Sequence, residues 1–214
     1  MLRKRGRPSE RTGTDQTALL KTALRLFGKS GFEGTNIKTI ASEAGVAGSL
    51  LYYHYTNKEG LWKAAMFLLG QELHAEMAAA EQLFRDLDPL SFMKAWMRRF
   101  VYFSATNPEF HLIITYEMAN SSKRADWLLE EILHPLHENF SLKAVQLQND
   151  GTIKKLPLAN FFSIAIGAAN VFFIQSYQMK KLFNTEVFDN SEIEKHADVV
   201  NEIIFNGLLE PVNN

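Results

Sequence analysis

Residues 36–61, NIKTIASEAGVAGSLLYYHYTNKEGL, decide how the rest of this chain is interpreted. Over residues 37–44 the apolar side chains fall on one side of a 3.6-residue period, which predicts a helix. Gly45 follows, at a point where a tight turn would crowd any residue that carries a Cβ. A second, shorter helix over residues 47–53 would complete the unit. The stretch therefore predicts a helix-turn-helix that runs into a further helix.

This unit resembles the DNA-binding head of the TetR family of one-component transcriptional regulators. The resemblance rests on Gly45-Val46, on the LYYHY sequence of residues 51–55 and on Lys58-Glu59. It extends over residues 14–61, and it departs from the family's frequent Ser, Lys or Gln, Gly and Thr at residues 47–50, where this chain has AGSL. The resemblance implies an all-α protein in which a three-helix head is joined to a larger helical domain for ligand binding and dimerisation.

The expected domain organisation follows from this resemblance. We expect a basic arm over residues 1–13, a helix-turn-helix DNA-binding domain over residues 14–60 and a helical ligand-binding and dimerisation domain over residues 61–214. A chain of 214 residues, 46% hydrophobic, can bury a sizeable core. The absence of cysteine excludes disulfides and thiolate metal sites and fits a reducing compartment. The basic start is not followed by an apolar run, so we expect a cytoplasmic protein without a signal peptide.

Charge is distributed unevenly along the chain. Residues 1–60 contain ten Lys and Arg against five Asp and Glu, whereas residues 61–214 contain thirteen against nineteen. A basic head on an acidic body is the pattern expected of a protein that binds DNA with one end. Short segments also vary in charge by chance, so the asymmetry supports DNA binding only together with the motif.

The basic arm contains a second candidate DNA contact. Its RGRP sequence, residues 5–8, resembles an AT-hook, an extended element whose arginines lie in a narrow minor groove. Narrow A·T-rich grooves have enhanced negative potential, so Arg5 and Arg7 are expected to be attracted there. The alternative is a basic tail that adds only non-specific affinity.

The residues that read DNA follow from the size of the two helices. A recognition helix of two turns reaches the major groove only with its first turn, together with the start of the preceding helix. By resemblance to the family, Lys38, Gly48, Ser49 and Leu50 fall at or near base-facing positions, and Lys38 is the best candidate for reading a base, because Gly48 has no side chain and Leu50 can only contact a thymine methyl group. Four further residues are expected either to contact the phosphate backbone or to pack the helices, and packing is at least as probable for the histidine: Tyr52, Tyr53, His54 and Lys58. The full predicted set is Arg5, Arg7, Asn36, Lys38, Gly48, Ser49, Leu50, Tyr52, Tyr53, His54 and Lys58.

The rest of the chain predicts helices with short breaks. Thr14 and Ser191 are the expected caps of the first and last helices. Residues 156–179 contain no charge and are long enough to cross a bilayer, but their Asn, Gln and Ser side chains favour a helix buried in protein. The expected helices span residues 14–31, 37–44, 47–53, 61–84, 88–107, 108–120, 126–149, 156–179 and 191–208, with a loop over 121–125 and a kink at 131–134 before Pro135.

By resemblance, the last two helices form a four-helix interface between two copies of the chain, and the middle helices enclose an effector pocket. A proline kink can open room beside a core. The alternative for each aromatic residue is ordinary core packing, which is the commoner role of such a stripe. The candidate ligand-binding residues are Trp96, Phe100, His111, Tyr116, Trp127, His134 and Phe173.

Neither a metal nor an enzymatic activity is expected. His134 and His137 lie three residues apart, as helical metal ligands can, but Pro135 disturbs that spacing and neighbouring carboxylates on a helix face are usually solvated. The sequence contains no nucleophile motif, phosphate-binding loop or dinucleotide-binding signature. We therefore predict no catalytic residues, no cofactor and no metal.

The sequence thus predicts a ligand-responsive, DNA-binding transcriptional regulator. The simplest form is a repressor that binds a palindromic operator as a homodimer and is released by a small, largely apolar effector. A ligand-responsive activator would have the same sequence features, and it would differ in where the operator lies relative to the promoter. An architectural DNA-bending protein is a further alternative, and it would bind DNA without sequence preference.

Overall fold

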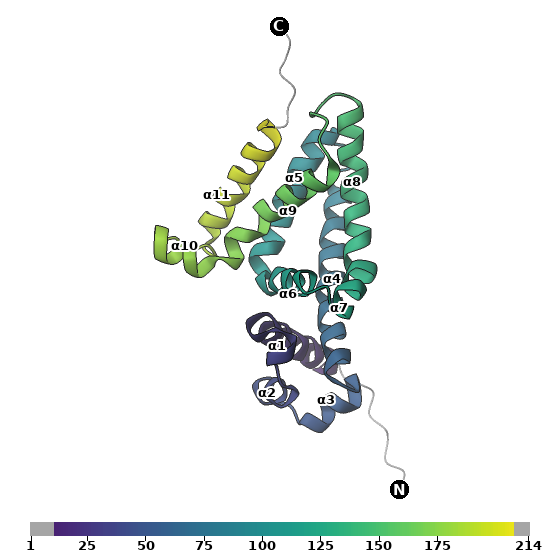
Figure 1. Ribbon diagram of the computed structural model, residues 1–214, viewed down its shortest axis with the longest axis vertical. Helices are drawn as coiled ribbons and strands as arrows, with labels where there is room; N and C mark the ends of the chain where they lie inside the picture. Colours follow the sequence, from purple (N-terminus) through teal and green to yellow (C-terminus); the bar gives the residue numbers. More distant parts are fainter. Residues whose placement is uncertain (1–10, 208–214) are drawn as a thin grey trace. The chain divides into compact units, whose positions relative to one another are not determined.

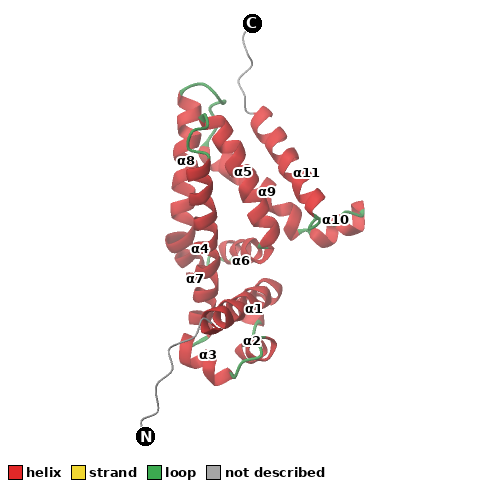
Figure 2. Cartoon of the chain, turned by 180° about the vertical axis from the view of Figure 1, so that it is seen from behind, coloured by secondary structure: helices red, strands yellow, loops and turns green. Residues whose placement is uncertain are grey.

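The computed structural model describes residues 11–207, and within this range the chain is helical and contains no strand (Figures 1 and 2). This confirms the all-α class. Arg5 and Arg7 of the arm lie outside the described residues. The helices are α1 (Arg11–Gly34), α2 (Ile37–Glu43), α3 (Gly48–Tyr55), α4 (Lys58–Leu83), α5 (Pro89–Thr106), α6 (Pro108–Ala119), α7 (Lys123–Leu128), the wide π-type turn η1 (Leu129–Leu133), α8 (His134–Asn149), α9 (Leu158–Ile174), α10 (Ser176–Phe183), α11 (Asn190–Asn201) and a second π-type turn, η2 (Glu202–Asn206).

The chain divides into two compact units, Met1–Leu69 and Gly70–Asn214. The division falls inside α4, so this one helix contributes residues to both units. The sequence-based domain boundary at residues 60 and 61 lies about one turn after the start of the same helix.

The first unit is a three-helix head closed by the start of α4. Its core contains Phe27, Ile40, Leu51 and Trp62, each with at most 1% of its surface exposed. The predicted cap at Thr14 is wrong, because α1 has already begun at Arg11. A single residue's capping preference is weak evidence against a chain whose helical pattern continues before it.

Glycines shape the turns of the head. Gly31 leaves helical geometry with φ 68° and ψ 172°, so the first helix breaks where the sequence predicted. Gly45 has φ 68° in the turn between α2 and α3. A Cβ on Gly60 would lie 2.2 Å from the backbone oxygen of Tyr55, so the close passage of α4 beside the end of α3 excludes any larger residue. The recognition helix α3 ends two residues later than predicted, at Tyr55.

In the second unit, α5 packs against α9 and α11, and α8 packs against α5, α9 and η1 (Figure 1). The α5 helix begins as predicted: Asp88 Oδ1 accepts hydrogen bonds from the backbone N–H groups of Leu90 and Ser91, at 3.1 and 3.0 Å. Met93, Met97 and other fully buried side chains fill the space between these helices.

Two predicted breaks in this unit are corrected. The loop expected over residues 121–125 is shorter, because α7 starts at Lys123 and is capped by Ser122, whose Oγ accepts from the Ala125 N–H at 3.1 Å. The disturbance expected before Pro135 takes the form of the wide turn η1, which begins at Leu129. Proline lacks an N–H and its ring crowds the carbonyl one turn earlier, and a widened turn relieves that conflict.

The uncharged segment expected as a single helix over residues 156–179 is two helices. The axes of α9 and α10 are bent by 70° at Gln175. The buried face of α9 ends at Phe173, whereas α10 has no buried residue, so packing ends where the helix bends. Among the described residues, no single helix is long and apolar enough to cross a membrane. The last helix begins at Asn190 after Asp189, so Ser191 is not its cap.

Candidate nucleic-acid interface and ligand cavity

Helix α3 exposes most of the residues predicted to contact DNA. Ser49 and His54 are exposed, and the exposed fractions of Leu50, Tyr52 and Tyr53 are 44%, 54% and 82%. Such exposure of large apolar and aromatic side chains is unusual for a two-turn helix, since these side chains normally pack inside. Only Leu51 of this helix is buried, and it anchors α3 to the head. Open space surrounds the Cα of Gly48, where an added Cβ would meet no atom within 4 Å.

The start of α2 presents the second group of predicted contacts. Asn36 caps this helix, with its Oδ1 accepting a hydrogen bond from the backbone N–H of Lys38 at 2.8 Å. The Lys38 side chain is exposed, and within residues 11–207 it forms no ion pair. A capped helix start with a free ammonium group beside it attracts anions.

Unlike the other predicted contacts, Lys58 turns its side chain toward the head itself. Its Nζ donates a hydrogen bond to the backbone oxygen of Thr35 at 3.1 Å and lies 4.3 Å from the ring centre of Phe32. These contacts hold the start of α4 against the segment between α1 and α2. The structure therefore gives Lys58 a role in packing the head.

Three of the predicted residues line one shallow groove on the head. The groove has a volume of about 550 Å³ and runs between the start of α2 and the turn that leads into α4. It brings together Asn36, Tyr52 and Lys58, with Asn57 beside them. Polar side chains from separate segments, with the carboxylate of Glu33 among them, thus meet on one surface of the head.

A largely apolar cavity of about 590 Å³ lies in the second unit. Its wall is formed by residues of α4, α5, α6, η1, α8 and α9. This volume is in the range of pockets that bind small molecules. The lining residues are Leu73, Trp96, Phe100, Phe110, His111, Ile114, Thr115, Met118, Leu129, Glu130, Leu133, His134, Leu136, His137, Phe162, Ile166 and Asn170.

Four of the seven predicted ligand-binding residues line this cavity: Trp96, Phe100, His111 and His134. The other three lie elsewhere. Tyr116 is 48% exposed on the outer side of α6, Trp127 is half-buried on α7, and Phe173 is buried beneath Phe172, Phe188 and His196. Helical spacing alone cannot tell which side of a buried helix faces a cavity, because that depends on the neighbouring helices.

Burial sets the charge state of His111, one of three histidines in this wall. His111 is 5% exposed and packs edge-on against Phe100, Phe103 and Phe110. Removal from water disfavours the imidazolium form and lowers the pKa of His111 from 6.5 to about 4. At neutral pH this imidazole is therefore uncharged.

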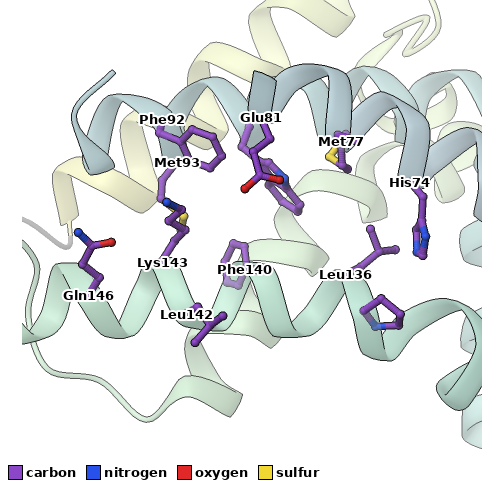
Figure 3. A pocket seen from close by; sticks show the side chains of 13 residues that line it. His74, Met77, Glu81, Phe92, Met93, Leu136, Phe140, Leu142, Lys143 and Gln146 are labelled. Carbon is purple, nitrogen blue, oxygen red and sulfur yellow. The ribbon is translucent and has the colours of Figure 1, made fainter. Parts of the chain in front are cut away.

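A second cavity, of about 480 Å³, shares part of this wall. Trp96 and Leu136 line both cavities. Figure 3 shows His74, Met77 and Glu81 on one side of the second cavity and side chains of α8, among them Phe140 and Lys143, on the other. Its lining is more polar than that of the first cavity.

The turn η1 belongs to the cavity wall and also contacts α4. Leu129 and Leu133 of η1 line the larger cavity. Ile132, at the same turn, lies so close to Gly70 of α4 that a Cβ there would be 3.0 Å from its Cγ2. The backbone oxygen of Ile132 also lies 3.2 Å from Nε2 of His74. These contacts were not predicted from the sequence, although a glycine inside a long helical pattern is a signal of close packing.

Comparison with known proteins agrees with this architecture. Residues 19–65 match the family described as bacterial regulatory proteins, tetR family. The HTH-type transcriptional regulator RutR of Escherichia coli K12 is 31% identical over 113 residues, which are 53% of this chain and 52% of RutR. The HTH-type transcriptional repressor ComR of the same organism is 37% identical over 62 residues, or 29% of this chain and 28% of ComR. The match to RutR thus spans about half the length of that curated relative.

Solved structures resemble the chain over nearly its whole length. A TetR family transcription regulator from Marinobacter aquaeolei VT8 superposes with a TM-score of 0.70 at 18% identity, covering 94% of this chain and 99% of that one. A mutant of the HlyIIR protein superposes with a TM-score of 0.72, also at 18% identity, covering 94% and 99%. At such low sequence identity, these structures establish only the fold of the chain. The evidence from sequence comes from the match of residues 19–65. The head of the chain, residues 19–65, thus matches the tetR family of bacterial regulatory proteins, and nearly the whole chain has the fold of solved TetR family regulators.

Proposed function

We propose that this protein is a ligand-responsive, DNA-binding regulator of transcription, most simply a repressor that binds a palindromic operator as a homodimer. The match of residues 19–65 to tetR-family regulatory proteins supports DNA binding. The match to ComR, which is named as a repressor, supports repression over activation. As a regulator of transcription the protein would act in the cytoplasm.

On DNA, the first turn of α3 would enter the major groove, where the open space at Gly48 allows close approach to the base edges. Lys38 would read a base, and Ser49 and Leu50 would contact neighbouring bases. Asn36, Tyr52, Tyr53 and His54 would position the head on the phosphate backbone. Lys58 would support these contacts from within the head. Arg5 and Arg7 would follow the adjacent minor groove.

Dimerisation would use α9 and α11. Ile164 and Val171 are exposed on α9, and Val199 on α11 and Ile203 on the following turn η2 are exposed as well, with exposed fractions of 63%, 38%, 51% and 69%. Each pair is spaced at seven or four residues, so each forms a stripe along one helix face. Two copies that bury these stripes would form a four-helix interface and carry two heads to successive major grooves.

The effector would enter the 590 Å³ cavity, and the observation that carries this proposal is the double role of η1. A ligand that pushes on Leu129 or Leu133 would displace the turn that touches Gly70 and His74 of α4. Helix α4 is continuous from Lys58, so its displacement would change how the heads are presented to DNA. The effector would release DNA only to the extent that its affinity for the displaced conformation exceeds its affinity for the DNA-binding conformation.

The test is selection of random DNA duplexes by the purified full-length protein at near-physiological salt, followed by sequencing of the retained pool. We expect an inverted repeat whose half-sites lie about one helical turn apart. That operator would then serve in a screen for small molecules that release it. A pool enriched only in A·T content would contradict the proposal and favour an architectural DNA-binding protein.

A further inference from the structure

The two buried polar side chains in the wall of the 590 Å³ cavity form no side-chain hydrogen bond within the described part of the chain. His111 on α6 is 5% exposed, and its Nε2 is buried without a partner. Asn170 on α9 is 8% exposed, and none of the side-chain hydrogen bonds within the described part of the chain involves it, although its carboxamide atoms are less enclosed than Nε2 of His111. Buried polar groups are nearly always hydrogen-bonded, and leaving them unpaired is unfavourable. The unmade hydrogen bond of His111 and the free carboxamide of Asn170 thus lie in the wall of one cavity, where a single bound molecule could pair with both.

The cavity offers little to hold a charged ligand. Among its lining residues, all within the described range, there is no Lys or Arg. The burial of His111 keeps its imidazole neutral, as the lowered pKa reflects. A carboxylate or phosphate placed in this cavity would lose its hydration without gaining a counter-charge, which is strongly unfavourable.

An amine would fare little better. The one carboxylate of the lining, Glu130, is exposed, as are His134 and His137. An exposed carboxylate holds an ammonium group weakly, since water screens the pair. The deeper wall consists of Phe100, Phe110, Phe162 and aliphatic side chains. This surface favours an apolar body.

We propose that the cavity binds an uncharged, largely apolar molecule whose hydroxyl or carbonyl oxygen forms hydrogen bonds with His111 and Asn170. A hydroxyl group can donate to the imidazole nitrogen and accept from the carboxamide N–H, which satisfies both side chains at once. The remainder of the molecule lies against the aromatic wall. The proposal rests on the proposed effector site and specifies the chemical class that the site selects.

The experiment measures binding to the purified full-length protein by calorimetry, without DNA. The rigid probes are 4-phenylphenol, biphenyl, biphenyl-4-carboxylate and 4-phenylbenzylamine, and the flexible probes are decanol, decanoate and decylamine. We expect 4-phenylphenol and decanol to bind about 10-fold or more tightly than the charged members of their series, since burying an unpaired charge is the larger penalty.

Two substitutions test the polar partners. His111→Phe and Asn170→Leu keep the approximate shape of each side chain and remove its hydrogen-bonding atoms. Each is expected to weaken binding of 4-phenylphenol about 3- to 10-fold, the usual worth of one hydrogen bond, and to leave the affinity for biphenyl unchanged. Tyr116→Phe is the matched control, because it removes a polar group from the same helix as His111 but outside the cavity, and it should alter neither affinity.

Three results would overturn the proposal. They are tighter binding of the carboxylates or amines, failure of every probe to bind the wild-type protein, and an equal loss of affinity for 4-phenylphenol and biphenyl in the two variants. The comparison among probes uses the wild-type protein, so it stands even if a variant does not fold. If the alcohols bind as expected but release no operator DNA, the ligand class is correct and the proposed regulation is wrong. If an operator is found but no uncharged probe binds, the proposed DNA binding is correct and the proposed ligand class is wrong.

Discussion

Gly70 of α4 and Ile132 of η1 are in contact so close that a Cβ on Gly70 would lie 3.0 Å from Cγ2 of Ile132. The other two nearest atoms, Cγ1 and Cδ1 of the same side chain, would be 3.2 and 3.3 Å away. The glycine is therefore part of a close-packed contact between the long helix and the wall of the larger cavity. Besides Leu73, which lines the cavity directly, this contact joins the cavity wall to α4.

Gly70→Ala is expected to destabilise the wild-type protein, because the new methyl group overlaps Ile132 in a packed interior. In an Ile132→Ala background the sign should reverse: the space is then open, and alanine is favoured over glycine in a helix by about 0.5–1 kcal/mol. Urea unfolding of the four proteins at one protomer concentration measures both effects. Destabilisation of similar size in both backgrounds would show that the contact with Ile132 is not the cause.

Lys58 and Lys38 are expected to behave oppositely when each is replaced by a neutral residue. Lys58→Met removes the hydrogen bond to Thr35 and the contact with the Phe32 ring, so it should lower the free energy of unfolding by about 1 kcal/mol. It should leave the preference among operator sequences unchanged. Lys38→Ala should weaken that preference without affecting stability. Denaturation and competition binding test the pair, and a Lys58→Met protein of wild-type stability would exclude the packing role.

Removal of residues 2–8 is expected to lower DNA affinity and flatten its dependence on salt. This segment contains Arg3, Lys4, Arg5 and Arg7, and each phosphate neutralised contributes about 0.9 to the slope of log K against log salt on duplex DNA. Titrations of the operator at several salt concentrations give the slope for both proteins. An unchanged affinity together with an unchanged slope would show that the arm does not contact DNA.

Acid should destabilise the protein through His111. Burial lowers its pKa from 6.5 to about 4, so below pH 6.5 the unfolded chain takes up a proton that the folded chain does not. The free energy of unfolding should therefore fall between pH 6.5 and pH 4, by up to about 1.4 kcal/mol per pH unit from this residue. His111→Phe should reduce the slope, leaving a remainder from His196, whose pKa is also lowered by burial. Equal slopes in the two proteins, from urea unfolding at each pH, would contradict this.

Breaking the buried ion pair between Arg124 and Glu117 should be strongly destabilising. Arg124 Nε donates to Glu117 Oε1 at 3.0 Å, and only 1% of the Glu117 side chain is exposed. Arg124→Met would leave a buried carboxylate without its cation, at a cost of about 3–5 kcal/mol. Replacing both residues by Met should restore most of the loss. If the double variant unfolds as readily as Arg124→Met, the cost comes from lost packing and not from the unpaired charge.

Several features of the head could be read directly from the sequence. Gly31 interrupts the first helix at the residue where the sequence predicted its end, and α2 begins at the predicted residue 37, after its cap Asn36. These features depend on residues a few positions apart, where periodicity and backbone preference act locally. The caps predicted at Thr14 and Ser191 were wrong, although these are residues of the kind that often cap helices. A residue caps a helix only where packing already ends that helix.

The cavity depended on contacts between distant segments. Trp96, Phe100, His111 and His134 line it, while Tyr116, Trp127 and Phe173 have the same chemical character and lie elsewhere. The partner of Lys58 is likewise 23 residues away, so an exposed basic residue in the motif could not be distinguished from one that packs the head.

The amino-acid sequence by itself therefore determined the all-helical class and the positions of the two helices and the turn of the helix-turn-helix, because these follow from local periodicity and turn chemistry. Only the tertiary structure decided which aromatic residues enclose a cavity, where the uncharged segment bends into α9 and α10, and that η1 touches α4 at Gly70. Those properties arise when helices far apart in sequence pack together, and the shape of the space between them is a property of all their side chains at once.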